Sequence, residues 1–248
     1  MENATYLALS NQLALRRQME TVANNIANTN TTGFRAERLL FASYLTPKAG
    51  TPGVGGDGAG KVAFVEGIGT YRDLRAGNMI KTDAPLDVAI HGNAYFVVET
   101  PVGNRYTRDG NFRLDGQGRM ANAEGFPLLD QNGQAIRIPA TAQVVEITRQ
   151  GDVVADGQRV GRIQLVQFVD DQALRRLGGG LYASDVDPVP ADARAETHQG
   201  ILEGSNVVSI SELTTMLDIT RRYESAQRVI DSEHERARKA IDRLARVA

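Results

Sequence analysis

Apolar residues near the end of the chain recur at alternating steps of three and four positions. They are Met216, Ile219, Tyr223, Ala226, Ile230, Ala237, Ala240 and Leu244, with Glu233 as the one interruption. This spacing places an apolar stripe along a helix and is typical of a coiled-coil seam. Because no Gly or Pro follows Gly204, we expect one helix from about Ile210 to Arg246, roughly 55 Å long.

The start of this helix carries its own signal. Ser209 followed by Glu212 forms a capping box, and Val208 can pack against Leu213 as a hydrophobic staple. A helix of this length extends beyond any domain that the chain can build. We therefore expect its apolar stripe to pack on another helix, from the same chain or from a neighbour.

The beginning of the chain has a second stripe with the helical period. Leu15, Met19, Val22 and Ile26 follow one another at steps of four, three and four, and no Gly or Pro interrupts residues 2–27. Such a helix packs into the core of a globular domain or pairs with the C-terminal helix. Pairing would bring the chain ends together and leave the middle of the chain as an insertion.

Asparagines gather where the N-terminal helix should end. Asn24, Asn25, Asn28 and Asn30 compete with the helical backbone for hydrogen bonds, and Gly33 can adopt a positive φ. This pattern indicates a helix end followed by a loop. A second interpretation is that Asn24 and Asn25 fix the register between packed helices, as a polar seam residue does.

The next segment, residues 35–80, begins without a clear period. Residues 35–46 suit a short helix or an extended arm, and residues 46–60 are rich in Gly and Pro, which is typical of a flexible loop. A Gly-x-Gly-x-x-Gly match at 53–58 lacks the preceding strand and following helix of a dinucleotide site. We expect an extended or flexible connecting segment that binds no cofactor.

From Val62 to about Leu202 the apolar period changes to two. Short apolar runs are separated by turn signals, and Gly92-Asn93 suggests a hairpin between the runs on either side. Many short strands without a crossover helix predict an antiparallel, barrel- or sandwich-like β domain over residues 81–204.

The predicted fold class is therefore α+β. The terminal helices, residues 1–34 with 205–248, pair as a coiled coil, and the all-β domain is inserted between them.

Composition and charge narrow the functional classes. The 248 residues carry a net charge of −2 and no Cys, so nothing indicates a nucleic-acid partner, and disulfides and thiolate metal sites are excluded. No apolar run approaches the ~20 residues of a membrane span, so we expect no direct membrane insertion. The start of the chain also lacks the pattern of a cleavable signal peptide.

Residue types that support catalysis or metal binding are scattered. His91, His198 and His234 lack the paired spacing of a metal site, and no nucleophilic Cys or Ser motif is present. The Asp residues lie at turns, where they more often form Asx turns than acid–base pairs. We expect neither an enzyme nor a metal site, since an enzyme would need distant carboxylates or histidines to meet in one cleft.

Three segments together resemble a known family. They are ANNIANTNTTGF at residues 23–34, the β region at residues 77–129 and the segment at residues 199–230 that leads into the last helix. In this order they resemble the bacterial flagellar rod and hook family, and the match covers nearly the whole chain.

The resemblance implies a structural, axial building block. Such proteins leave the cell through the flagellar type III export apparatus without a cleaved signal. In the periplasm they polymerise helically, with themselves and other axial proteins, into the rod of the flagellar basal body. The terminal helices form the inner tube, and length and the opening sequence favour a subunit of the proximal rod over one of the distal rod.

Subunit contacts are expected at the helical stripes and at the family motifs. These residues are Leu15, Met19, Val22, Asn24, Asn25, Ile26, Gly33, Phe34, Leu202, Ser205, Asn206, Val207, Leu213, Met216, Ile219, Arg222, Tyr223, Ile230, Ala237 and Leu244. Since the N-terminal helix is the shorter one, the stripe toward Ala237 and Leu244 should stay available to other subunits. The alternative to a rod subunit is a β-domain binding module on a helical dimerisation stalk.

Overall fold

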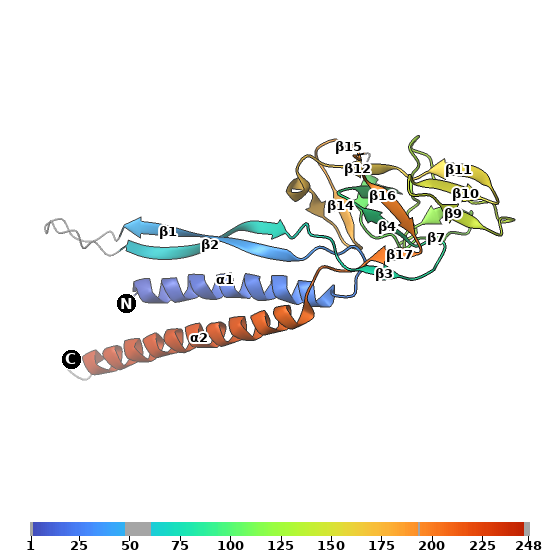
Figure 1. The fold of residues 1–248 in the computed structure, drawn as a ribbon. Coiled ribbons are helices and arrows are strands. Elements are labelled where there is room, and N and C mark those ends of the chain that lie inside the picture. The colour runs from blue at the N-terminus through green and yellow to red at the C-terminus, as the bar shows by residue number, and fades with distance from the viewer. Residues whose placement is uncertain (1, 48–60, 193, 246–248) are drawn as a thin grey trace. The chain divides into compact units, whose positions relative to one another are not determined.

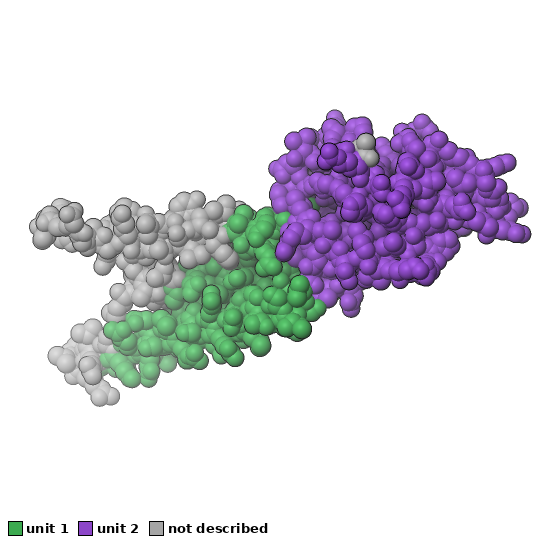
Figure 2. Space-filling model, viewed as in Figure 1, with its two compact units in different colours: residues 1–27, 37–72, 208–248 green, residues 28–36, 73–207 purple. Residues whose placement is uncertain are grey.

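The computed structural model describes residues 2–47, 61–192 and 194–245, without the side chains of residues 2–7, 41–47, 61–68, 237, 240, 241 and 243–245. The chain forms two compact units (Figure 2). One, called the helical unit, comprises residues 1–27, 37–72 and 208–248. The other, called the β unit, comprises residues 28–36 and 73–207. The asparagine-rich loop after the first helix thus groups with the β unit.

Both predicted terminal helices are confirmed. Helix α1 spans Glu2–Ala27 and helix α2 spans Ser209–Ala245, and the two run side by side in the helical unit (Figure 1). Their contact is built from the two predicted stripes. Leu15, Val22 and Ile219 are buried there, and Met19, Ile26, Met216 and Tyr223 pack around them. Between the helices Gln12 Nε2 also donates a hydrogen bond to Gln227 Oε1 at 2.6 Å.

A long hairpin completes the helical unit. Strand β1 (Glu37–Pro47) pairs antiparallel with β2 (Lys61–Arg72), with a register shift between Leu40 and Phe41. Helix α1 lies against both strands (Figure 1). The sequence allowed a short helix or an extended arm for residues 35–46, and the structure shows an extended strand. The Gly-rich loop and its Gly-x-Gly-x-x-Gly match, at residues 48–60, lie outside the described residues.

The β unit is built from short antiparallel strands, so the α+β class is confirmed. Its strands are β3 (Met79–Lys81), β4 (Val88–His91), β5 (Tyr95–Thr100), β6 (Gly103–Thr107), β7 (Arg113–Leu114), β8 (Met120–Ala121), β9 (Val145–Ile147), β10 (Asp152–Ala155), β11 (Gln158–Arg162), β12 (Leu165–Gln167), β13 (Arg175–Arg176), β14 (Leu181–Ala183), β15 (Val189–Pro190), β16 (Glu196–Gln199) and β17 (Ile201–Glu203). A 3₁₀ turn spans Asp171–Ala173.

The largest sheet has six strands in the order β13-β14-β6-β5-β12-β15. A three-stranded sheet has the order β11-β10-β9, and β16-β4, β17-β3 and β7-β8 form separate two-stranded pairs. The predicted hairpin at Gly92-Asn93 is wrong, because β4 pairs with β16 while β5 pairs with β6 and β12. The carbonyl oxygens of Gly92 and Ala94 accept hydrogen bonds from Arg108 Nη1.

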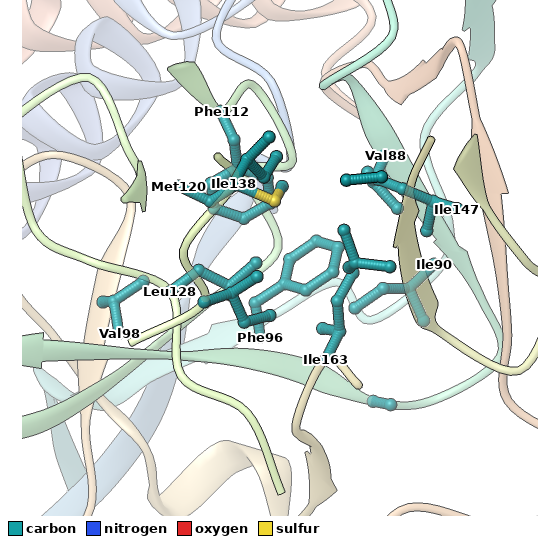
Figure 3. Packing of buried hydrophobic residues seen from close by; sticks show 14 of the residues in the cluster. Val88, Ile90, Phe96, Val98, Phe112, Met120, Leu128, Ile138, Ile147 and Ile163 are labelled. Carbon is teal, nitrogen blue, oxygen red and sulfur yellow. The ribbon is translucent and has the colours of Figure 1, made fainter. Parts of the chain in front are cut away.

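Strand β5 is buried on both faces and divides the core of the β unit. Phe96 and Val98 point into the larger cluster with Leu128, Met120 and Ile163 (Figure 3). The alternate residues of the same strand, Tyr95 and Val97, belong to a second cluster with Tyr106, Phe168 and Tyr182. Because successive side chains of a strand point to opposite faces, a continuous apolar run is the pattern that such a doubly covered strand requires.

Candidate functional site

A buried carboxylate in the β unit joins stretches that lie in or directly beside the three segments on which the family resemblance rests. This residue is Glu203, which is only 1% exposed. It is the last residue of β17 and lies within the C-terminal segment at residues 199–230. Its Oε1 lies 2.6 Å from Arg35 Nη2, at the end of the asparagine-rich loop. Its Oε2 accepts from Nε and Nη2 of Arg108, which follows β6, at 3.0 and 2.9 Å. We call these three residues the ion cluster.

The ion cluster also fixes backbone segments around it. Gly77 N donates to Glu203 Oε1 at 3.0 Å, and Arg35 Nη1 donates to the carbonyl oxygens of Leu74, at 2.9 Å, and Arg75. Burial lowers the pKa of Arg35, and the charge of Glu203 opposes this effect. One carboxylate facing two buried guanidinium groups leaves a net positive charge, so backbone carbonyls are needed to satisfy the remaining donors.

Asn206 connects the C-terminal segment to residues next to the other two segments. Its Oδ1 accepts from Ala36 N at 2.7 Å, and its Nδ2 donates to the carbonyl oxygens of Asp73 and Arg75 at 2.8 and 2.9 Å. Its backbone N donates to Phe34 O at 3.2 Å. The side-chain amide therefore holds two separate chain segments against the C-terminal segment, which gives this predicted site residue an intramolecular role.

The glycine of the asparagine-rich loop is required by both backbone conformation and space. Gly33 has φ +66°, and a Cβ atom added there would lie 2.5 Å from the carbonyl carbon of Arg108. Its N–H donates to Glu203 O at 2.7 Å. Beside it, Phe34 packs with Ala36 and Val207, and the Arg176 guanidinium lies 4.0 Å above the Phe34 ring.

A half-buried aspartate, Asp109, also holds the asparagine-rich loop. Thr32 Oγ1 donates a hydrogen bond to Asp109 Oδ1, which also accepts from Asn111 N at 3.0 Å. Burial raises the pKa of Asp109, and the hydrogen bond from Thr32 partly offsets this shift. Asp109 thus acts as a structural acceptor for the loop.

In the helical unit, the corresponding polar centre is Asn25, which is 1% exposed. Its Oδ1 accepts from Glu37 N at 3.0 Å and its Nδ2 donates to Glu37 O at 2.8 Å, so the amide pairs with the start of β1 as a strand residue would. Nδ2 also donates to Glu212 Oε2 on α2 at 3.2 Å. Asn25 therefore fixes α1, β1 and α2 together, in line with the interpretation that it sets register.

Glu212 does not take the role that the predicted capping box gave it. Helix α2 begins at Ser209, one residue earlier than expected, so Ser209 is not the cap residue that the capping box requires. The Glu212 side chain instead turns toward Asn25, and its Oε1 lies 3.8 Å from Arg38 Nη2. A cavity of about 170 Å³ opens at this point between α1, β1, β2 and α2.

The predicted contact residues fall into three groups. Leu15, Val22, Asn25, Ile219, Gly33, Phe34, Leu202 and Val207 are buried, and Met19, Ile26, Met216, Tyr223, Ile230, Ser205 and Asn206 are half-buried. Asn24, Leu213 and Arg222 are exposed. The side chains of Ala237 and Leu244 lie outside the described ones.

Sequence reasoning missed the central role of three charged residues. Arg35, Arg108 and Glu203 were not among the predicted contact residues, although Arg108 and Glu203 lie within motif segments and Arg35 directly follows one. The available signal was a charged residue inside a segment with mostly apolar and small neighbours. Charges in such surroundings are buried only when they are paired.

The described residues offer no arrangement for metal chemistry. They contain no group of three or more His, Asp or Glu side chains that could hold a metal ion. His91 and His198 lie on neighbouring strands with ring centroids 6.2 Å apart in an edge-on arrangement. Among the helices that the structure describes, none is long and apolar enough to cross a membrane.

Three family models match the chain in order. "Flagella basal body rod protein" matches residues 6–35, "Flagellar hook protein FlgE/F/G D1 domain" matches residues 89–155, and "Flagellar basal body rod FlgEFG protein C-terminal" matches residues 198–243. Each matched segment contributes one residue to the ion cluster, namely Arg35, Arg108 and Glu203.

Curated proteins match over nearly their full length. The "Flagellar basal-body rod protein FlgF" of Caulobacter vibrioides is 39% identical over 248 residues, covering 100% of both chains. The FlgF protein of Mesorhizobium japonicum is 33% identical, covering 91% of this chain and 90% of its own. The "Flagellar basal-body rod protein FlgG" of Bacillus subtilis is 30% identical, covering 95% of this chain and 96% of its own.

Proposed function

Because this chain belongs to the flagellar basal-body rod protein family, we propose that it is a structural subunit of the rod and not an enzyme. The observation that carries the proposal is the meeting of all three family-matched segments at Glu203. A buried network across such distant segments preserves one tertiary arrangement. The family membership also favours this role over a β-domain binding module.

Within the family, we assign the chain to the FlgF type and to the proximal rod. The full-length similarity to the Caulobacter protein of that name supports this assignment. A distal-rod subunit is the second candidate, because FlgG proteins also match over most of the chain. Both assignments place the chain in the basal body, with other axial proteins as its partners.

Assembly in the periplasmic rod would be helical and would proceed through the terminal helices, paired as a coiled coil. Exposed apolar residues on both helices support this, because they are left uncovered within the described chain: Leu9 and Leu13 on α1, and Ile210, Leu213 and Leu217 on α2. Two different surfaces on one subunit favour head-to-tail contacts, which build open helical filaments when the rotation does not close. Export through the flagellar type III apparatus without a cleaved signal is part of the same proposal.

The function is tested by complementation of a strain that lacks the gene. The full-length chain should restore swimming and should appear in purified basal bodies, whereas chains without residues 1–28 or 209–248 should do neither. Circular dichroism and limited proteolysis would show whether the β unit of each truncated chain remains folded. A truncated chain that still builds a rod would contradict the proposal.

A further inference from the structure

Two arginines face each other at the surface of the β unit. Arg119 and Arg137 are directly opposite in an antiparallel bridge. The backbone hydrogen bonds of this bridge join the residues on either side of the arginines and not the arginines themselves. Such a non-hydrogen-bonded pair brings cross-strand side chains closest together. Because like charges directly opposite each other are destabilising, this pair costs the isolated chain stability.

One carboxylate pairs with these arginines within the described chain. Asp115 Oδ2 lies 2.7 Å from Arg119 Nε, and its Oδ1 already accepts from two backbone N–H groups. Exposed Arg137 forms no ion pair among the described residues. The same holds for exposed Arg113, which pairs with Ala121 in β7–β8 and so lies diagonally from Arg119. We call Arg113, Arg119 and Arg137 the arginine patch, which is positive because three guanidinium groups face one carboxylate.

Exposed aspartates and valines gather at another part of the β unit. Strands β12 and β15 are antiparallel, with Gln167 opposite Val189, so the residues after β12 lie beside the residues before β15. Val169 and Val186 in these two stretches are 94% and 63% exposed. The same stretches hold three exposed aspartates, which we call the aspartate patch: Asp170, Asp185 and Asp187.

The aspartate patch keeps a negative charge after its neighbours are counted. Asp185 lies 3.2 Å from Arg175, and the other two aspartates form no ion pair among the described residues. Burial raises the pKa of Tyr106, the charge of Asp187 raises it further and Arg105 opposes this, which places both charges near that ring. The Arg105 guanidinium donates to carbonyl oxygens of its own hairpin. Three carboxylates therefore face two arginines.

We propose that the arginine patch of one copy of this chain binds the aspartate patch of a second copy. The patches have opposite charges, and guanidinium groups can donate two parallel hydrogen bonds to a carboxylate. Strands β7 and β15, which mark the two patches, lie well apart in the β unit (Figure 1). A contact between two different surfaces is heterologous and can repeat from subunit to subunit along a filament. The choice of a second copy as the partner rests on the proposed rod function.

Cross-linking in assembled rods tests the geometry of this contact. The chain has no Cys, so Gln117→Cys beside the arginine patch and Val186→Cys within the aspartate patch introduce the only thiols. In basal bodies treated with a short bismaleimide, the chain with both substitutions should form cross-linked dimers and longer oligomers. Each single variant should remain monomeric. Dimers from a single variant, or no oligomers from an incorporated double variant, would overturn the inference.

Val144 provides the matched control for cross-linking. It is another exposed valine of the β unit, 55% exposed, and it lies outside the aspartate patch. Gln117→Cys combined with Val144→Cys should give no oligomers, because the proposed contact does not bring these positions together. An equal yield of oligomers from the control pair would overturn the inference.

Charge reversal tests the electrostatic part of the proposal. Arg137→Glu and Asp187→Arg should each lower the amount of the chain in purified basal bodies by about fivefold, the factor that corresponds to ~1 kcal/mol for an exposed ion pair. The double variant again places opposite charges across the contact and should recover most of this loss. Arg149→Glu reverses an exposed arginine outside both patches and should leave the amount unchanged. Native amounts of both single variants, or no recovery in the double variant, would overturn the inference.

Unfolding of the isolated full-length chain separates a lost contact from a misfolded subunit. Arg137→Glu places an opposite charge across from Arg119, so the melting temperature should be unchanged or raised. A lowered melting temperature would overturn the inference, because its starting point is the like-charge pair. All these negative results leave the rod function standing, whereas absence of the native chain from basal bodies would contradict the rod function itself.

Discussion

Replacing Glu203 with Gln should destabilise the β unit strongly. The side chain is 1% exposed and lies between Arg35 and Arg108, whose side chains are 6% and 3% exposed. The substitution preserves shape but leaves two buried guanidinium groups without their counter-charge. Removing one partner of a buried ion pair costs about 3–5 kcal/mol, which is a large part of the ~5–15 kcal/mol that stabilises a typical domain.

The loss is measured by urea and thermal unfolding of the full-length chain, followed by circular dichroism. With about 2–4 °C per kcal/mol for a chain of this size, the melting temperature of the β unit should fall by roughly 6–20 °C. Glu196→Gln is the matched control, since Glu196 is 44% exposed and lies 3.9 Å from His198. It should cost at most about 1 kcal/mol. Equal losses for the two variants would refute the role of the ion cluster.

Three further substitutions test other parts of the structure. Gly33→Ala should destabilise the chain by more than Gly125→Ala in urea unfolding, because both positions have positive φ and only the first would place a Cβ against backbone; equal losses would contradict the close approach. Asn25→Ala should cost roughly 2–4 kcal/mol in unfolding free energy, and exposed Asn24→Ala about 1 kcal/mol or less; the reverse order would contradict the assigned role. Burial raises the pKa of Asp109, so in the pH window above the ordinary Asp value of about 3.9 the folded chain binds more protons than the unfolded chain, and this group's contribution to stability falls as pH rises through the window. Asp109→Asn should remove that fall, measured as the difference in unfolding free energy between the two chains across the window, and an unchanged difference would contradict it.

The terminal helices could be predicted because their signal is long and local. The stripe from Leu15 to Ile26 and the stripe from Met216 to Ile230 extend over several turns without Gly or Pro. The two stripes pack against each other, since Leu15, Val22 and Ile219 meet in one cluster. Burial of an amphipathic stripe is the main source of helix stability in proteins, so the sequence pattern and the packing carry the same information.

The β1–β2 hairpin was harder to predict for a physical reason. Leu39, Leu40 and Phe41 are consecutive apolar residues, so the alternation that marks a half-buried strand is absent. The register shift falls between the second and third of them, and a bulge of this kind breaks the period of two. A Gly- and Pro-rich stretch between the two strands also hides their relation.

The ion cluster could not be predicted from local pattern. Arg108 and Glu203 are separated by 95 positions, and no periodicity connects residues so far apart. The failed hairpin at Gly92-Asn93 has a similar origin, because β4 pairs with β16, which lies far away in the sequence. The family resemblance identified the right segments, whereas the structure was needed to show which charged side chain of each segment meets the others.

The most direct test of the rod assignment is a cryo-electron microscopy map of intact basal bodies purified with and without this chain. Density for the β unit and for paired α1 and α2 should be present in the proximal rod of the native particle and absent from the particle that lacks the chain. Density for the chain in the distal rod would move it to the second candidate. Native particles without this chain anywhere along the rod would contradict the central claim.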